Sequence, residues 1–338
     1  MVVLPLGLPD SAAGGLPANE IILIPVFNDW ESVALLIPEL EKNLAAASRR
    51  AEVILVDDCS VARPDNLQIA DELTAIRSID VLTLARNLGH QRAIAIGLSY
   101  VALRRPCRAV VVMDGDGEDL ASDVPRLLNA FDESRGQHVI FAKRTRRSEG
   151  AVFALFYRLY RIAHWLLTGI RVEVGNFSVV PYPVVKKLAV VSDMWNHYAA
   201  AVMHARIPTT LVPTVRGRRL AGRSTMNFVS LVAHGLSAMS VFADRIGVRL
   251  LATTGILMVV LFVALLVAVF VRFFTDLAIP GWTTVVLGFL TVLLVQTAIL
   301  SMVFMFMIQM GRAGSSFIPG RDYELFVDSV KRIWEKRE

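Results

Sequence analysis

The chain has 338 residues, of which 54% are hydrophobic and 19% charged, and its formal net charge is +5. A mean hydropathy of +0.53 is high for a soluble protein, so membrane spans are expected. The sequence lacks the G-x-x-x-x-G-K-S/T, G-x-G-x-x-G, H-E-x-x-H and G-x-S-x-G motifs, and ATP hydrolysis, hydride transfer and serine hydrolysis therefore lose support. Two cysteines, Cys59 and Cys107, form no disulfide or metal pattern, which fits a reducing compartment.

The first part of the chain has the pattern of repeated βα units. Residues 1–19 contain no basic residue and several prolines and glycines, which predicts a loose tail rather than a signal peptide. After them, short apolar runs alternate with longer mixed segments, as in a mostly parallel α/β sheet. We expect buried strands at Ile21–Phe27, Val53–Asp58, Ile79–Leu84 and Ala109–Asp114, and a weaker one at Val139–Ala142. Helical spacing of apolar residues predicts helices at Glu31–Ala47 and Gln91–Leu103.

Polar or acidic residues end three of these strands, at Asn28–Asp29, Asp57–Asp58 and Asp114–Asp116. In open α/β sheets, ligands bind beyond the carboxyl ends of the strands, so this coincidence indicates a binding site. The carboxylates of Asp114 and Asp116 can share Mg²⁺ or Mn²⁺, and Gly115 leaves room for a diphosphate. A simple polar turn is the alternative, because Asp and Gly are common turn residues.

Two further stretches suit a nucleotide sugar. Asp57 and Asp58 could accept hydrogen bonds from a base or a ribose hydroxyl, or could cap the following helix. The stretch Arg86–Arg92 places two arginines, an amide and a glycine where they could meet phosphate or sugar hydroxyls. By itself, this stretch would be only a basic loop.

Basic and aromatic residues are mixed between about residue 143 and residue 248. Ala151–Gly169 and Met226–Gly247 are predicted helices that lie at a membrane interface or, alternatively, face an ordinary core. The loop Arg216–Ser224 is dense in arginine and contains glycine. Such a run first suggests nucleic acid, but its place before a membrane segment favours a lipid phosphate or diphosphate. A purely electrostatic anchor to anionic lipid is the alternative.

Two long uncharged runs, Leu250–Val271 and Thr284–Met310, predict a membrane hairpin. At 1.5 Å per residue, each is about 33 Å or longer, which is the thickness of a hydrocarbon core. Basic residues lie before the first run and after the second, whereas the connection offers only Arg272. The positive-inside rule therefore places the large N-terminal domain and both termini in the cytoplasm.

Five motifs together resemble family-2 glycosyltransferases of the polyprenyl-phosphate branch, which contains dolichol-phosphate mannosyltransferase. Each motif occurs in order and at normal spacing, although Cys59 replaces a usual glycine and Gly117 and Glu118 replace Leu and Gln. The motifs are Ile24–Asn28 (I-P-x-Y/F-N), Val56–Ser60 (V-D-D-G-S), Ala85–Gly97 (R-N-x-G-x-x-x-A-x-x-x-G), Met113–Asp119 (D-x-D-L-Q-D) and Ala142–Arg146 (G-x-R-x-x-R).

The resemblance implies a GT-A fold, a Rossmann-like and mostly parallel sheet, in residues 20–225. A juxtamembrane amphipathic helix (226–248), two transmembrane helices (249–311) and a basic cytoplasmic tail (312–338) are expected to follow. By analogy, Pro25, Phe27, Asn28 and Asp57 hold the base and ribose, Asp114 and Asp116 hold the metal and diphosphate, and Arg219, Gly222 and Ser224 gather phosphate in an R-x-x-G-x-S motif. The candidate donor-site residues are Pro25, Phe27, Asn28, Asp57, Asp58, Arg86, Asn87, Gly89, Gln91, Asp114 and Gly115; the candidate acceptor-phosphate residues are Arg144, Arg216, Arg219, Gly222 and Ser224; and the candidate catalytic residues are Asp114, Asp116 and Asn176.

Two departures from the family pattern bear on the acceptor. Asn176 stands where relatives often carry aspartate, and Thr225 stands where lysine is usual. Asparagine cannot act as a general base, which an alcohol acceptor requires. A phosphate monoester has a second pKa near 6 and is already largely the nucleophile at neutral pH. The departure at Asn176 therefore favours a phosphate acceptor or a narrower sugar specificity.

These observations predict the inverting transfer of a sugar from UDP or GDP to a polyprenyl phosphate at the cytoplasmic membrane face, assisted by Mg²⁺ or Mn²⁺. One alternative is a transferase of the same fold that extends a glycan on a hydroxyl, with Glu118 or Asp119 as the base. Another is a non-catalytic membrane scaffold. A nucleic-acid partner is not expected. Gln296, Thr297, Ser301 and Gln309 could bond between two copies or within one hairpin, so a homo-oligomer stays open.

Overall fold

The chain divides into two compact units in a computed structural model. The model describes residues 19–61, 72–144, 162, 164–170, 174–222, 228–275, 279, 281–313 and 317–336. The first unit comprises residues 1–148, 173–227 and 317–338, and the second comprises residues 149–172 and 228–316.

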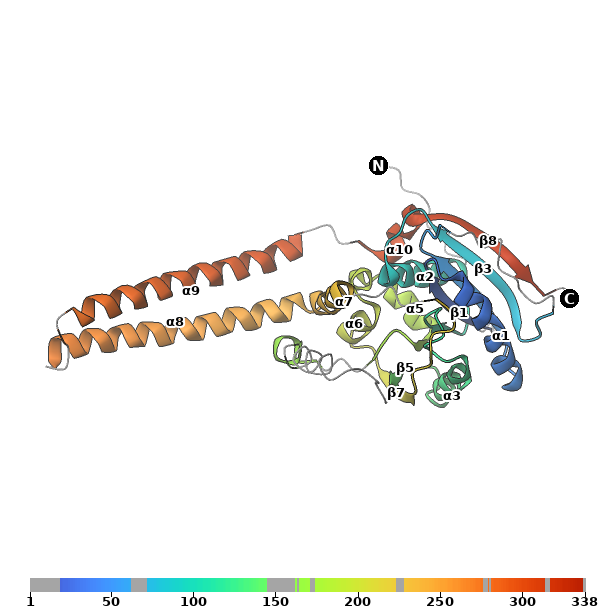
Figure 1. The fold of residues 1–338 in the computed structure, drawn as a ribbon, viewed down its shortest axis with the longest axis horizontal. Helices are drawn as coiled ribbons and strands as arrows, with labels where there is room; N and C mark the ends of the chain where they lie inside the picture. The colour runs from blue at the N-terminus through green and yellow to red at the C-terminus, as the bar shows by residue number, and fades with distance from the viewer. Residues whose placement is uncertain are drawn as a thin grey trace. The chain divides into compact units, whose positions relative to one another are not determined.

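The first unit is built on a sheet (Figure 1). Its described strands number eight, in the order β7-β5-β6-β4-β1-β2-β3-β8. Strands β4, β1, β2 and β3 are parallel neighbours. Strand β6 runs antiparallel to β4, and β8 runs antiparallel to β3. The predicted mostly parallel sheet is therefore confirmed. The strands are β1 Glu20–Val26, β2 Ala51–Asp57, β3 Ile76–Leu84, β4 Ala109–Val112, β5 Val139–Arg144, β6 Ser178–Pro181, β7 Thr209–Thr214 and β8 Val327–Glu335.

Helices cover both faces of this sheet, because successive side chains of a strand point to opposite faces. Ile21 and Leu23 of β1 pack in one core with α2, α5 and α6, while Ile22 and Ile24 pack in a second core with α1 and α3. The bounds are α1 Trp30–Ala46, α2 His90–Arg104, α3 Val124–Glu133, α5 Tyr182–Leu188 and α6 Tyr198–His204. The predicted helices over Glu31–Ala47 and Gln91–Leu103 are confirmed to within about one residue.

The close packing of α2 on the sheet requires a glycine. A Cβ atom on Gly97 would lie 2.7 Å from Leu23 Cδ1 and 2.8 Å from Val56 Cγ2, and both side chains are fully buried. We expect Gly97→Ala to lower the free energy of unfolding by about 1–3 kcal/mol, because the core must move to admit the methyl group. Chemical denaturation of the detergent-purified protein measures this. Leu103→Ala, at an exposed position of the same helix, is the control, and equal losses in the two variants would contradict the prediction.

The expected basic tail over residues 312–338 is wrong for residues 317–336, which return to the first unit. After α10 (Pro319–Asp322) and a short 3₁₀ turn, β8 pairs antiparallel with β3. Arg332 of β8 donates to Asp80 of β3 at 2.8 Å, and Arg105 bonds the same buried carboxylate. Because β8 is a half-exposed edge strand with charged residues, it lacks the continuous apolar run by which buried strands are recognised.

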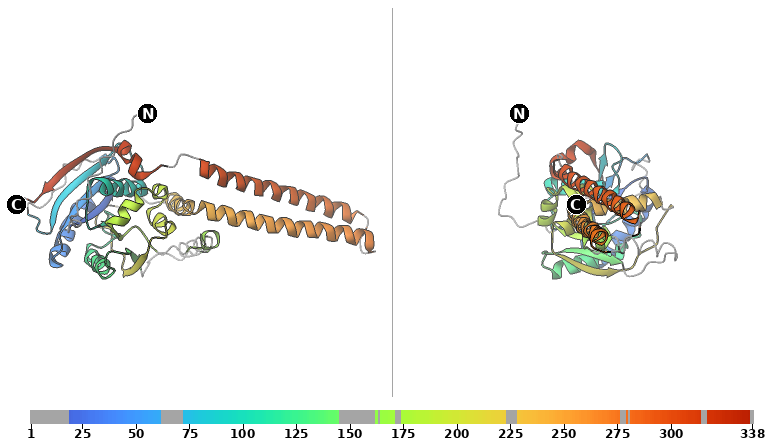
Figure 2. Two further views of the ribbon diagram at one scale, coloured as in Figure 1. Left: turned by 180° about the vertical axis from the view of Figure 1, so that it is seen from behind. Right: turned by 90° about the vertical axis from the view of Figure 1, so that its left-hand side faces the viewer.

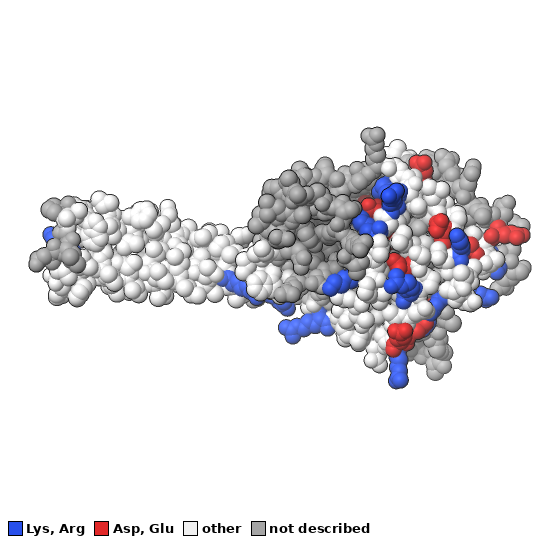
Figure 3. Space-filling view, turned by 60° about the horizontal axis from the view of Figure 1, so that its bottom comes forward, with Lys and Arg blue, Asp and Glu red and all other residues white. Residues whose placement is uncertain are grey.

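The second unit contains the two long apolar helices. They are α8 (Ala243–Phe274) and α9 (Trp282–Ala313), with mean hydropathies of 3.0 and 2.3 over their most apolar windows, of which only 11% and 6% is buried. They lie side by side (Figure 2), and Ser301 donates to Thr254 across them at 2.7 Å. Their visible face carries no charged side chain between its ends (Figure 3). Both are candidate membrane spans, at the predicted positions.

The two predicted interfacial helices belong to the same unit. The segment expected to form one helix over Met226–Gly247 is divided, because α7 covers Phe228–Ser240 and α8 begins at Ala243. Most of the segment Ala151–Gly169 lies outside the described residues. Its described end, residues 164–168, is helical, and Arg249 donates to the carbonyl oxygen of Leu166 at 2.7 Å.

Candidate active site

The loops after β1 and β2 are tied together at the carboxyl ends of these strands. The backbone N–H of Asn28 donates to Ser60 Oγ at 2.8 Å, and Asn28 Oδ1 accepts from the N–H of Val61 at 2.8 Å. Asp57 Oδ1 accepts from the N–H of Ser60 at 2.9 Å. Phe27 is 49% exposed beside them, so its ring is open to solvent at the strand end. Asn28 and Asp57, two of the predicted base and ribose residues, are therefore joined at this end of the sheet through Ser60.

Asp58 holds the loop after β3 rather than facing solvent. Its side chain is buried and accepts from the N–H groups of Leu88 and Gly89 at 2.7 and 2.8 Å. Burial raises the pKa of Asp58, although the two amide bonds oppose the shift. In the exposed part of that loop, Arg86 and Asn87 present their side chains to solvent. Asp58 thus fixes the loop that carries Arg86 and Asn87, two of the predicted donor-site residues.

The predicted metal residues follow β4. Asp114 Oδ1 lies 3.0 Å from His90 Nε2, and Asp116 Oδ2 lies 3.1 Å from Arg219 Nη1. Burial raises the pKa of Asp116, and the neighbouring carboxylate of Asp114 raises it further. Gly115 is closely covered, because a Cβ atom there would lie 3.0 Å from Ile24 Cγ2. The arrangement concentrates negative charge at the end of β4.

The carboxylates of Asp114 and Asp116 fit a divalent cation that takes its other ligands from a nucleotide and from water. The side chains of Asp114 and Asp116 are 28% and 20% exposed, so both remain open to a ligand. Within the described part of the chain, no group of three His, Cys, Asp or Glu side chains is arranged as a metal site. Mg²⁺ and Mn²⁺ commonly complete their coordination with water and phosphate oxygens, which suits a site with two protein oxygens.

The predicted acceptor loop is packed against the acidic loop after β4. Its backbone N–H groups at Gly217 and Leu220 donate to the carbonyl oxygens of Glu118 and Asp116 at 2.8 and 2.9 Å. A Cβ atom on Gly117, whose φ is +82°, would lie 2.4 Å from Leu220 Cγ. Contact this close leaves no room for a side chain at position 117, and the two loops form one structure.

Charges reinforce the contact between these loops. Arg219 bonds Asp29 at 2.5 Å and Asp116 at 3.1 Å, and thereby joins the ends of β1 and β4. Arg216 Nε donates to Glu118 Oε2 at 2.8 Å. Asp119 is buried and accepts from the N–H of Asp114 at 3.0 Å. Glu118 and Asp119, the bases considered for a hydroxyl acceptor, are therefore engaged in holding the loops.

The structure adds His90 to the predicted site and shows that Gln91 bonds other residues of the protein through both ends of its amide. Asn176 Nδ2 lies 3.0 Å from His90 Nε2, and Asn176 Oδ1 accepts from Gln91 Nε2 at 3.1 Å. Burial lowers the pKa of His90, but the nearby carboxylates, above all Asp114, outweigh this and leave it raised. Gln91 is buried and uses both ends of its amide within the protein, because its Oε1 accepts from the N–H of Tyr198 at 2.8 Å.

The structure describes the other four predicted residues to different extents. Pro25 lies inside β1, opposite Val56 of β2. Arg144 is the last residue of β5, and its side chain lies outside the described residues, as does the whole of Ser224. Gly222 is exposed, with a φ of +68°.

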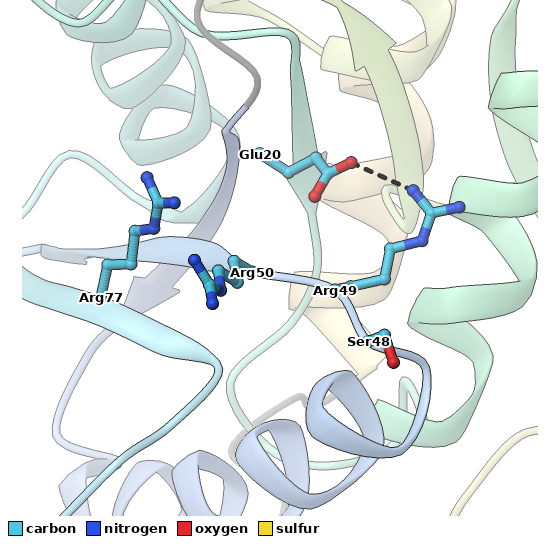
Figure 4. A pocket seen from close by; sticks show the side chains of 5 residues that line it. All are labelled: Glu20, Ser48, Arg49, Arg50 and Arg77. Atoms are coloured by element: carbon cyan, nitrogen blue, oxygen red, sulfur yellow. Dashed lines mark hydrogen bonds and ion pairs between the residues drawn. The ribbon is translucent and has the colours of Figure 1, made fainter.

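A hollow lies at the opposite, amino ends of β1, β2 and β3 (Figure 4). Arg49 bonds Glu20 there at 3.1 Å, and Ser48, Arg50 and Arg77 complete the lining. Since ligands of such sheets bind at the carboxyl ends of the strands, this hollow is separate from the candidate site.

Comparison with known proteins agrees with this geometry. Residues 21–188 match the family model described as Glycosyl transferase family 2. The chain is 25% identical over 272 residues to an uncharacterised glycosyltransferase, YkcC, of Bacillus subtilis (strain 168), covering 78% of this chain and 81% of that protein. It is 31% identical over 157 residues to the undecaprenyl-phosphate 4-deoxy-4-formamido-L-arabinose transferase of Pseudomonas fluorescens (strain SBW25), covering 44% of this chain and 42% of the transferase.

Solved structures also match part of the chain. Glucosyl-3-phosphoglycerate synthase from Mycobacterium tuberculosis, solved with Mn²⁺, UDP-glucose and glycerol 3-phosphate, is 14% identical with a TM-score of 0.47. The match covers 69% of this chain and 81% of that one.

Proposed function

Because residues 21–188 form a Glycosyl transferase family 2 domain, we propose that the chain transfers a sugar from a nucleoside diphosphate to a polyprenyl phosphate, with inversion at the anomeric carbon. The observation that carries this proposal is the packing of the basic loop 216–222 on the acidic loop 114–118. Such a contact would bring a phosphate-binding loop to the place where a diphosphate is held. The named undecaprenyl-phosphate transferase among the relatives supports a lipid phosphate as acceptor.

The donor is proposed to bind across the ends of β1, β2 and β4. Phe27 offers an exposed ring to the base, and the exposed Asn28 and the buried Asp57 next to it are the proposed polar contacts of the base and ribose. Asp114 and Asp116 would hold Mg²⁺ or Mn²⁺, which supplies positive charge to the departing diphosphate. The nucleotide of the donor is proposed to be UDP or GDP.

The acceptor is proposed to bind through the basic loop. Arg216 and Arg219 offer guanidinium groups to its phosphate, and Gly222, Ser224 and Arg144 are the other proposed contacts. A phosphate oxygen forms the new bond to the anomeric carbon while the bond from that carbon to the nucleoside diphosphate breaks. A phosphate already ionised at neutral pH needs no base, which suits a site whose nearest acidic residues are engaged.

We propose that α8 and α9 cross the membrane as a hairpin and keep the acceptor's phosphate near the domain. Strands β3 and β8 are paired in one sheet although the hairpin lies between them in the chain. This pairing supports a topology in which both ends of the hairpin leave the membrane on the same side. The basic residues at these ends favour the cytoplasmic side. A tail at 1–19 remains part of the proposal, and α7 takes the place of the juxtamembrane helix expected at 226–248.

The proposal is tested by incubating the purified full-length protein with labelled UDP- and GDP-sugars and Mn²⁺. Each donor is paired with a polyprenyl phosphate or with the dephosphorylated polyprenol. We expect a labelled, mild-acid-labile glycolipid to form only with the phosphate, since the new bond is a glycosyl phosphate. Transfer to the polyprenol, or only to a glycan hydroxyl, would support the alternative acceptor. Transfer to none of them would contradict the proposal.

A further inference from the structure

The orientation of the Asn176 side chain follows from a backbone N–H group nearby. The N–H of Tyr198 can only donate, so the atom of Gln91 that it meets at 2.8 Å is the amide oxygen. The other end of Gln91 is therefore its N–H₂ group, which donates to Asn176 at 3.1 Å. Asn176 must accept this bond with its oxygen, and its N–H₂ group then faces His90, whose Nε2 is 3.0 Å away.

The residues that fix this orientation are held rigidly. Gln91 lies in the first turn of α2 and is 8% exposed, and Tyr198 begins α6 and is fully buried. Ser178 Oγ donates to the carbonyl oxygen of Asn176 at 2.8 Å and also bonds the Tyr198 hydroxyl at 2.7 Å. The backbone of Asn176 is thus tied to α6 through Ser178, and its side chain is tied to α2 through Gln91. A flip of the Asn176 amide would set its N–H₂ group against that of Gln91.

We propose that Gln91 is a positioning residue that turns the N–H₂ group of Asn176 toward a phosphate oxygen of the substrate. The N–H₂ group stands beside His90, which contacts Asp114, so it borders the place where the diphosphate and the acceptor's phosphate would meet. The residues that the structure describes offer its two protons no acceptor besides His90 Nε2, a ring nitrogen that also lies 3.0 Å from Asp114 Oδ1. This inference rests on the proposed function and adds a fixed hydrogen-bond donor to the site.

The same geometry accounts for asparagine rather than aspartate at position 176. An aspartate could still accept from Gln91, but it would offer no donor and would add a negative charge beside Asp114. Phosphate oxygens accept hydrogen bonds and are repelled by carboxylates. A site that handles two phosphate groups gains from an amide with its nitrogen turned outward.

Gln91→Glu tests the proposal by inverting the amide. One carboxylate oxygen of Glu still accepts from Tyr198, and the other now accepts from Asn176, whose own oxygen must then face the site. We expect Gln91→Glu and Asn176→Leu each to weaken phosphate binding by about tenfold, the cost of one lost hydrogen bond to a charged group. Two quantities are measured on the full-length protein: the Kd for UDP with Mn²⁺, and the KM for a short-chain prenyl phosphate. Gln137→Glu, at an exposed position, controls for added charge.

The double variant separates positioning from charge and from structure. If Gln91 acts through Asn176, Gln91→Glu with Asn176→Leu binds no more weakly than Asn176→Leu alone. Additive losses, or unchanged binding in Gln91→Glu with an unchanged melting temperature, overturn the proposal. A loss confined to KM assigns the donor group to the acceptor's phosphate, and a loss confined to the Kd assigns it to the diphosphate. If the parent protein transfers no sugar, the proposed function fails, while UDP binding still tests this inference.

Discussion

Asp116→Ala is expected to lower kcat/KM for sugar transfer by about 10²–10³-fold while the protein remains folded and inserted. Asp116 is a proposed cation residue, and it also holds Arg219 of the basic loop at 3.1 Å. The loop keeps its other contacts, including the bond from Arg219 to Asp29, so its position should survive the change. The loss should therefore fall on the stabilisation of the departing diphosphate rather than on folding.

Asp116→Ala is not expected to lower the melting temperature. Burial raises the pKa of Asp116, which means that the folded state disfavours its charged form. The ionised side chain therefore opposes folding as pH rises through the raised pKa, and at neutral pH its removal should leave the melting temperature unchanged or higher. Transfer of labelled sugar, calorimetry with UDP and Mn²⁺, and thermal unfolding measure the three quantities. Glu133→Ala, on the exposed side of α3, is the control, and undiminished transfer by purified Asp116→Ala would remove the proposed metal role.

Asp80→Asn is expected to lower the free energy of unfolding by about 2–4 kcal/mol, because it removes the buried negative charge that Arg105 and Arg332 share. Asp80 is 2% exposed on β3. Arg332 of β8 donates to it at 2.8 Å, and Arg105 bonds it from the loop after α2. Both arginines remain partly exposed, so solvent replaces some of the lost interaction. The change should loosen β8 first, since Arg332 is its link to the buried carboxylate.

The pH dependence of this loss follows from the pKa of Asp80. Burial raises that pKa, but the hydrogen bonds from Arg332 and Arg105 outweigh burial and leave it below its ordinary value of 3.8. The stabilisation is therefore complete above the ordinary value and disappears as pH falls through the lower folded value. Parent and Asp80→Asn should differ by a constant amount from about pH 5 to 8, and the difference should shrink below about pH 4. Asp328→Asn, exposed on β8, is the control; equal effects of the two variants would contradict the prediction.

The central strands could be predicted because each is a buried apolar run, and burial on both faces gives a strand an unmistakable composition. The other strands carry weaker signals. β6 has only four residues, and β7 alternates between exposed and half-buried positions. β8 carries Lys331 and Arg332 on an edge, where a basic composition is the same as that of a solvated tail. The buried partner of its Arg332 is Asp80, which lies 252 residues earlier in the chain.

The sequence indicated individual residues of the candidate site but not the contacts between them. Polar residues at strand ends indicated Asp57, Asp114 and Asp116, because the carboxyl ends of parallel strands share one edge. The bond from Arg219 to Asp116 spans 103 residues, and that from Tyr198 to Gln91 spans 107. No local pattern encodes contacts of this separation. A lone histidine is likewise uninformative until the fold places His90 against Asp114.

The pairing of β3 with β8 also dictates an order of events during synthesis. β8 follows α8 and α9 in the chain, so it leaves the ribosome only after both apolar helices have emerged. Until then the outer edge of β3 presents unpaired backbone groups, which is the kind of surface on which nascent chains aggregate. The apolar hairpin therefore emerges before the last strand can close the sheet, and any delay between the two prolongs the exposure of this edge.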